Sequence, residues 1–84
     1  MNKSAKEMFE EIGYFKIENN ETLKWLFKTS DDDCKTICFS KKSKYIRLYY
    51  VIKEDVVLFC DELQAINKQV EELWGKQDGN MEEN

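Results

Sequence analysis

Side chains that could support catalysis are sparse in this chain of 84 residues. The chain has no histidine, which is the commonest general base in enzymes. It also has no phosphate-binding loop, no dinucleotide fingerprint and no nucleophile elbow. The neighbouring carboxylates Glu71 and Glu72 would diverge on a helix rather than converge on one substrate. We therefore predict a protein that is not an enzyme and that needs no cofactor.

Side chains that commonly bind metal ions are present but poorly spaced for that purpose. Asp31, Asp32 and Asp33 are consecutive, whereas an EF-hand needs alternating ligands, a central glycine and a distal glutamate. Cys34 and Cys38 lie in a strand-like segment, where a separation of four residues spans roughly 13 Å. That distance is too long for a disulfide or for one shared ion. Because the number of cysteines is odd, we expect no disulfide framework and expect all three cysteines to be reduced. We also predict no metal site.

Charge is distributed unevenly along the chain, whose net charge is −4. Residues 22–53 carry eight basic and three acidic side chains, whereas residues 54–84 carry two basic and nine acidic ones. A basic middle followed by an acidic end can present surfaces of opposite sign to binding partners. The alternative is that these charges only keep the protein soluble and that their uneven distribution has no role in binding.

The first predicted helix covers residues 5–12. Ser4 and Glu7 have the spacing of a capping box, in which each side chain bonds to the backbone of the other residue. Gly13 can adopt the left-handed conformation that ends helices at little cost.

The second predicted helix begins near Cys60 and ends at Gly75, with Asp55 as an alternative N-cap. Its apolar residues recur at helical spacing, so one face is predicted to pack on the core. These core residues are Leu63, Ile66, Val70 and Leu73, with Trp74 beside them.

Between the helices, alternating apolar and polar residues predict four strands over residues 14–18, 22–29, 34–40 and 45–52. Short connections favour an antiparallel meander. We therefore predict an α+β fold in which both helices pack on one face of a four-stranded antiparallel sheet. Residues 1–75 would form the single domain, and the acidic residues 76–84 a disordered tail.

Basic and aromatic residues are expected to interleave on the sheet face that the helices leave open. Such a face is typical of stacking platforms for single-stranded nucleic acid, although no RNA-recognition motif is present. A protein-binding face and an ordinary solvent face are the alternatives. The candidate binding residues are Lys24, Lys28, Tyr45, Arg47 and Tyr49.

A second candidate surface is acidic and comprises Glu62, Glu71 and Glu72 on the second helix. Clustered carboxylates can imitate nucleic-acid phosphates and occupy a basic groove on a partner. The alternative is a solvated helix surface.

Residues 5–14 read AKEMFEEIGY, and residues 62–73 read ELQAINKQVEEL. This pairing resembles a group of small phage and prophage proteins of Gram-positive bacteria, which combine an "AKEMFE-x-x-G-Y" start with an "ELQAIN-K-Q-x-x-EL" end. The resemblance covers both predicted helices, whereas the strand region matches only in its aromatic and lysine-rich character. The chain departs from the group at Phe59, where a Thr or Ser cap is usual, and at Trp74-Gly75, where the group has Gly-Trp.

The resemblance implies a phage setting, in which small acidic proteins without catalytic apparatus often modulate host machinery, anti-CRISPR proteins among them. We therefore expect a non-enzymatic protein-binding module, an inhibitor of a host defence system for example, that engages a host or phage protein in the bacterial cytoplasm. The alternatives are a nucleic-acid or nucleotide binder and a homodimer formed through exposed apolar surface. No membrane association is expected, because the longest apolar run, residues 56–60, is too short to span a bilayer.

Overall fold

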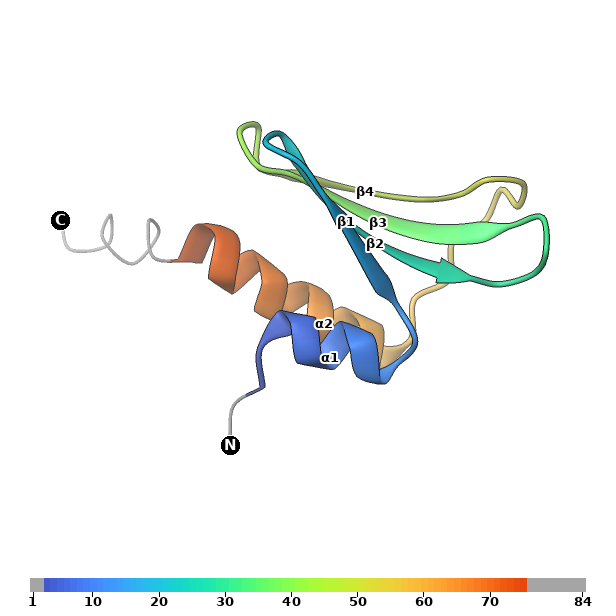
Figure 1. Cartoon of the computed structure of the whole chain (residues 1–84), viewed down its shortest axis with the longest axis horizontal. Coiled ribbons are helices and arrows are strands. Elements are labelled where there is room, and N and C mark those ends of the chain that lie inside the picture. The colour runs from blue at the N-terminus through green and yellow to red at the C-terminus, as the bar shows by residue number, and fades with distance from the viewer. Residues whose placement is uncertain (1–2, 76–84) are drawn as a thin grey trace, which may run out of the picture.

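The computed structural model describes residues 3–75 as two helices flanking four strands (Figure 1). The helices are α1 (Ala5–Glu11) and α2 (Cys60–Val70), and α2 continues into a π-helical turn, η1 (Glu71–Gly75). The strands are β1 (Phe15–Glu18), β2 (Thr22–Lys28), β3 (Cys34–Ser40) and β4 (Tyr45–Tyr50). The predicted tail, residues 76–84, lies outside the described residues.

The sheet is an antiparallel meander with the strand order β1-β2-β3-β4. Both helices cover the same face of this sheet and leave the other face open (Figure 1). Trp25 pairs with Ile37, which pairs with Leu48, and this row faces the helices because Trp25 and Ile37 are fully buried. The predicted α+β architecture is confirmed.

The start of α1 follows the predicted capping box. The Glu7 amide donates to Ser4 Oγ at 3.1 Å, and the Ser4 amide donates to Glu7 Oε1 at 2.9 Å. Gly13 has a φ of 96° after the helix ends, a conformation that L side chains rarely adopt. The chain then reverses into β1.

The core between helices and sheet is built on aromatic contacts. Phe9 of α1 stacks on Trp25 with ring centroids 4.7 Å apart, and Tyr14 meets Phe9 edge-on at 5.4 Å. Ala65 and Ile66 of α2 are buried in the same cluster. Aromatic pairs bury a large apolar area per ordered residue, which matters in so small a domain.

The second helix packs on the core through Ile66, Val70 and Leu73, as predicted, but not through Leu63. Leu63, predicted to be in the core, is 45% exposed, whereas Glu62 and Gln69 are buried. The prediction was wrong for Leu63 because the sheet presents polar groups to this helix. The Trp25 indole donates to Gln69 Oε1 at 2.8 Å, and a buried lysine of β3 bonds to Glu62. A buried donor without a partner is costly, so the helix turns its polar side chains toward the sheet.

Two contacts fix the C-terminal end of the helix. Trp74 is buried, and its indole donates to the backbone oxygen of Lys41 in the β3–β4 turn at 3.3 Å. The Glu72 carboxylate accepts from the Ala5 amide at 2.8 Å and so joins the second helix to the first. In the described part of the chain, no helix is both long enough and apolar enough to cross a membrane.

The fourth strand ends at Tyr50, two residues earlier than predicted. It ends there because the Asp33 carboxylate accepts hydrogen bonds from the next three backbone amides. Asp33 Oδ1 accepts from the amides of Val51 and Ile52, each at 2.9 Å, and Oδ2 accepts from the Lys53 amide at 3.3 Å. These amides therefore bind a side chain instead of continuing the ladder.

Candidate functional site

The open face of the sheet is a surface of two registered rows. The first row contains Phe15, Leu26, Thr36 and Tyr49, which are opposite one another in successive strands. The second row contains Ile17, Lys24, Cys38 and Arg47. Because neighbouring strands lie about 4.8 Å apart, each row spans roughly 14 Å across the sheet.

The two rows have a shallow centre and raised edges. Thr36 and Cys38 of β3 are short and are 5% and 7% exposed, whereas Phe15 and Ile17 of β1 are each 50% exposed. A binding partner that covers large, half-exposed apolar side chains on an edge strand removes them from water, which stabilises the complex. Phe15 and Ile17 were not among the predicted site residues. Their alternation with Lys16 and Glu18 in the sequence was the available signal.

The five residues predicted for this face all lie on it. Lys24 and Arg47 share one row, and the Arg47 guanidinium lies over the Tyr49 ring, 5.6 Å from its centroid. Tyr45, 49% exposed, is near the β3–β4 turn, whereas Lys28 lies at the opposite end of the sheet. Lys24, Arg47 and Tyr49 therefore form one group, with Tyr45 and Lys28 at its two ends.

A shallow pocket of about 230 Å³ adjoins Lys28. The pocket lies between the start of β1 and the β2–β3 loop, and it combines an apolar wall with carboxylates. Its lining residues are Phe15, Lys28, Asp31, Asp32, Asp33, Cys34 and Val51. The positive charge of Lys28 is thus surrounded by negative charge, unlike that of Lys24 and Arg47.

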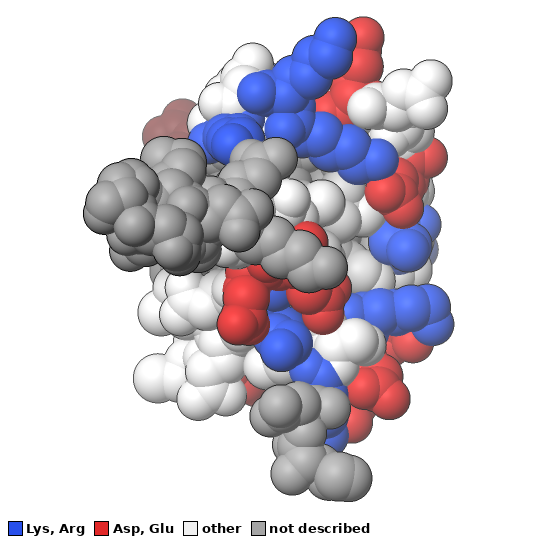
Figure 2. Space-filling view, turned by 90° about the vertical axis from the view of Figure 1, so that its left-hand side faces the viewer, with Lys and Arg blue, Asp and Glu red and all other residues white. Residues whose placement is uncertain are grey.

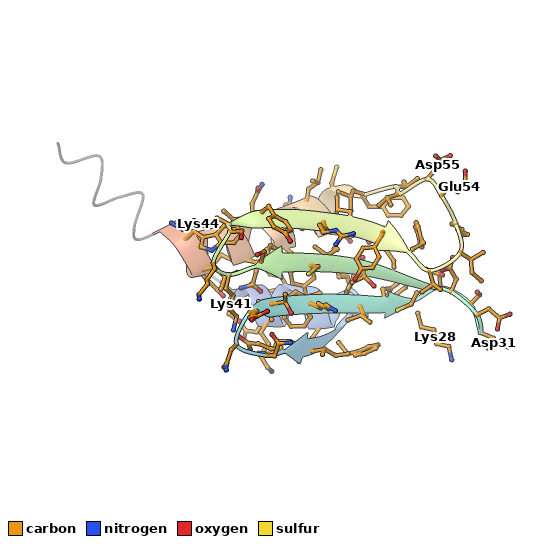
Figure 3. All side chains as sticks on the ribbon, turned by 90° about the horizontal axis from the view of Figure 1, so that it is seen from above. Lys28, Asp31, Lys41, Lys44, Glu54 and Asp55 are labelled. Atoms are coloured by element: carbon orange, nitrogen blue, oxygen red, sulfur yellow. The ribbon has the colours of Figure 1, made fainter. Side chains whose placement is uncertain are left out.

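The β3–β4 turn is basic, whereas the two loops at the other end of the sheet are mainly acidic. Figure 2 shows lysine side chains gathered over the hairpin turns at the top of the molecule. In Figure 3, Lys41 and Lys44 mark this end, whereas Asp31, Glu54 and Asp55 mark the other. The meander places the β3–β4 turn at one end and both acidic loops at the other. The β1–β2 turn shares the first end, where Glu18 pairs with Lys41 at 2.7 Å.

The predicted acidic surface is not formed as expected. Glu62 is 6% exposed and bonds to Lys35, so its assignment to a surface is corrected. Glu71 is exposed and pairs with Lys68 at 3.3 Å, and Glu72 caps the amide of Ala5. Glu62 is therefore separated from Glu71 and Glu72, which are both exposed and line one surface pocket with Lys68 and Gly75.

Glu62 instead belongs to a buried polar cluster that the sequence did not reveal. Both of its carboxylate oxygens lie 2.7 Å from Lys35 Nζ, Tyr14 donates to Oε2 at 2.5 Å, and the Phe59 amide donates to Oε1 at 2.7 Å. Burial opposes ionisation, but the bonds from Lys35, Tyr14 and Phe59 outweigh it and lower the pKa of Glu62. Burial, reinforced by the bond to Glu62, raises the pKa of the Tyr14 hydroxyl.

An open pocket of about 410 Å³ borders this cluster and is lined by Lys35, Glu62, Phe59, Tyr50 and four further residues. The polar groups of the cluster bond to one another, and no buried side-chain nitrogen or oxygen lacks a partner within residues 3–75. The polar groups of the cluster therefore all have hydrogen-bond partners within the protein, and none is left to bind a ligand. Among these residues, no group of three or more Cys, Asp or Glu is placed to hold a metal ion.

The chain matches no protein-family model, no curated protein and no solved structure.

Proposed function

We propose that the protein is a non-enzymatic binding module whose open sheet face contacts a partner protein. The observation that carries this proposal is the exposure of Phe15 and Ile17 beside the registered group of Lys24, Arg47 and Tyr49. An apolar rim beside aromatic and basic side chains has the composition of protein-binding sites, in which Tyr, Phe and Arg are enriched.

The partner is expected to carry an apolar patch bordered by carboxylates. Phe15, Ile17 and Leu26 would bury the patch, while Lys24 and Arg47 would pair with the carboxylates. Arg47 is suited to this role because the neighbouring Tyr49 ring supports its planar guanidinium at 5.6 Å.

The resemblance of the helices to phage and prophage proteins supports a host or phage protein in the bacterial cytoplasm as this partner. In that setting, occupying a surface of a host enzyme suffices to inhibit it, without any chemistry by the inhibitor. An inhibitor of a defence nuclease would act in this way.

Single-stranded nucleic acid is the second candidate ligand. Its support is the arrangement of Lys24, Arg47 and Tyr49, since bases stack on aromatic rings and phosphates pair with cations. Against it, the apolar side chains of β1 offer nothing to phosphate, and the net charge of −4 weakens attraction to a polyanion.

The test compares Ile17→Glu with Val57→Glu in a pull-down from bacterial lysate. The two side chains are similarly exposed, at 50% and 54%, but Val57 lies in the β4–α2 connection, which runs from the sheet to the helix layer (Figure 1). We expect one protein to be retained by the wild type and by V57E and to be lost with I17E. Recovery of the same protein by all three chains, or of none, would contradict the proposal. A salt-sensitive shift of labelled single-stranded DNA that is lost with R47E would favour the second candidate instead.

A further inference from the structure

The two edges of the sheet differ in how they are protected. β1 has four residues, and its charged residues Lys16 and Glu18 point to the helix side of the sheet. Inward-pointing charges and short length are common devices against edge-to-edge pairing. The first edge is therefore closed to another strand.

The other edge, β4, lacks these devices. It has six residues, reads YIRLYY and carries Arg47 as its single charge. Within residues 3–75, the backbone of β4 makes its hydrogen bonds to β3 alone. An edge strand of aromatic and branched residues, with its outward backbone N–H and C=O groups unpaired, can form hydrogen bonds with a further strand.

We infer that β4 pairs in antiparallel fashion with β4 of a second copy of this chain, around a twofold axis at Leu48. Opposite residues in a sheet point to the same face, so a twofold axis must pass beside one residue near the middle of the strand. An axis at Arg47 would place two guanidinium groups opposite each other, which is unfavourable. An axis at Leu48 places Arg47 opposite the partner's Tyr49, and Ile46 opposite the partner's Tyr50.

The charges at the two ends of the sheet suit this arrangement. Antiparallel pairing of the two β4 strands brings the β3–β4 turn of one copy beside the segment that follows β4 in the other. The first carries Lys42 and Lys44, and the second carries Glu54 and Asp55 beside Lys53, which leaves it one net negative charge; all five side chains are exposed. Figure 3 labels Lys44 at one end of the sheet and Glu54 and Asp55 at the other. The twofold axis repeats this contact, so opposite charges meet at both ends of the paired strands.

Exposed apolar surface on the helix side of β4 also favours a second copy of the chain at this edge. Glu72 contacts α1, and Glu62 contacts the sheet. The first turn of α2, which contains Leu63, lies beside β4, since Asp61 and Glu62 line one pocket with Tyr50. Leu63 is 45% exposed, and a second copy would bury it together with the partly buried Leu48.

The pairing would join the two sheets into one of eight strands, with all four helices on one side and both open faces on the other. The inference does not depend on the proposed function, because it uses an edge of the sheet rather than its open face.

The first test measures the dissociation constant by sedimentation equilibrium for the wild type and two charge variants. Each double variant turns exposed opposite-charge contacts into like-charge contacts at both ends of the paired strands, so K42E/K44E and E54K/D55K should each weaken dimerisation by about tenfold or more. A mixture of the two variants should restore a heterodimer, because each supplies the sign that the other has lost. The matched control K6E/K68E changes the same charge on the helices and should dimerise like the wild type.

The second test determines the register by oxidative cross-linking in a Cys60→Ser background, which removes an exposed thiol. With the axis at Leu48, L48C faces its own copy and should form a disulfide dimer, whereas I46C should not. A wild type that stays monomeric up to millimolar concentration overturns the inference. So does a dimer whose dissociation constant is the same in both charge variants as in the K6E/K68E control.

Discussion

Lys35 Nζ lies 2.7 Å from both carboxylate oxygens of Glu62, and the two side chains are 4% and 8% exposed. This ion pair joins the central strand β3 to the first turn of α2. A charged pair in the interior is stable only when its remaining hydrogen-bonding groups are also satisfied. Here Tyr14 and the Phe59 amide bond to the carboxylate, and Lys35 also lies over the Phe59 ring at 5.5 Å.

Breaking this pair from one side should be strongly destabilising. Lys35→Met leaves a buried carboxylate without its counter-ion, and we expect the free energy of unfolding to fall by about 3–5 kcal/mol. The double variant K35M/E62M removes both charges and should recover much of that loss. Urea denaturation followed by tryptophan fluorescence measures all three values. A K35M variant as stable as the wild type would show that the pair is open to water.

The stability of the protein should decrease in acid because of Glu62. Its folded-state pKa is lowered, so folding favours the ionised form. The corresponding stability is complete above the unfolded pKa, about 4.3 for glutamate, and is lost as the pH falls below that value through the folded pKa. Thermal melts between neutral pH and pH 3 should show this decline. E62Q cannot ionise, so its melting temperature should depend less on pH, and an unchanged dependence would refute the assignment.

The sequence predicted the elements well because their signals are local. The Ser4–Glu7 capping box and the conformational freedom of Gly13 determine α1, and alternation determines β3, whose predicted and observed bounds agree. Strand ends were less predictable. β4 stops before Val51 because of Asp33, which is distant in sequence, and no local pattern reveals such a partner.

The side chains that face the core were harder to predict than the elements. Alternation with Ile37 places Lys35 on the helix side of β3, yet a lysine is normally assigned to solvent. Once Lys35 is inside, α2 must supply a carboxylate, which turns Glu62 inward and leaves Leu63 exposed. The first turn of α2 therefore departs from the predicted hydrophobic stripe because of a requirement that arises in another element, whereas Ile66, Val70 and Leu73 follow it. The open face was predicted more completely, because its residues alternate with core residues in the same strands.

Asp33 should control the order of the segment that follows β4. Its carboxylate also accepts from the Cys34 amide at 2.9 Å, so it joins the β2–β3 loop to residues 51–53. Burial would raise its pKa, but the four amide donors hold the pKa of Asp33 below its usual range. We expect Asp33→Ala to lower the melting temperature and to speed hydrogen exchange at the amides of Val51 and Ile52.

The neighbouring Asp32, which is exposed, provides the control for this experiment. D32A changes the same charge in the same loop and should leave the exchange rates of Val51 and Ile52 as they are in the wild type. Equal exchange at these amides in D33A and D32A would mean that the carboxylate of Asp33 does not hold the segment.

Gly13 should be intolerant of any side chain, for two separate reasons. Its φ of 96° is strained for other residues, and an added Cβ would lie 2.8 Å from Cε1 of the Phe27 ring. A left-handed residue with a Cβ costs about 1–2 kcal/mol, and displacement of Phe27, whose ring lies 5.3 Å from that of Tyr14, adds to this cost. We therefore expect Gly13→Ala to lower the urea midpoint clearly. Gly75→Ala is the matched control, because its Cβ would meet only the Glu71 side chain, at 3.1 Å from Cγ, which can move aside. If both alanine variants unfolded at the wild-type midpoint, the chain reversal between α1 and β1 would differ from the one described.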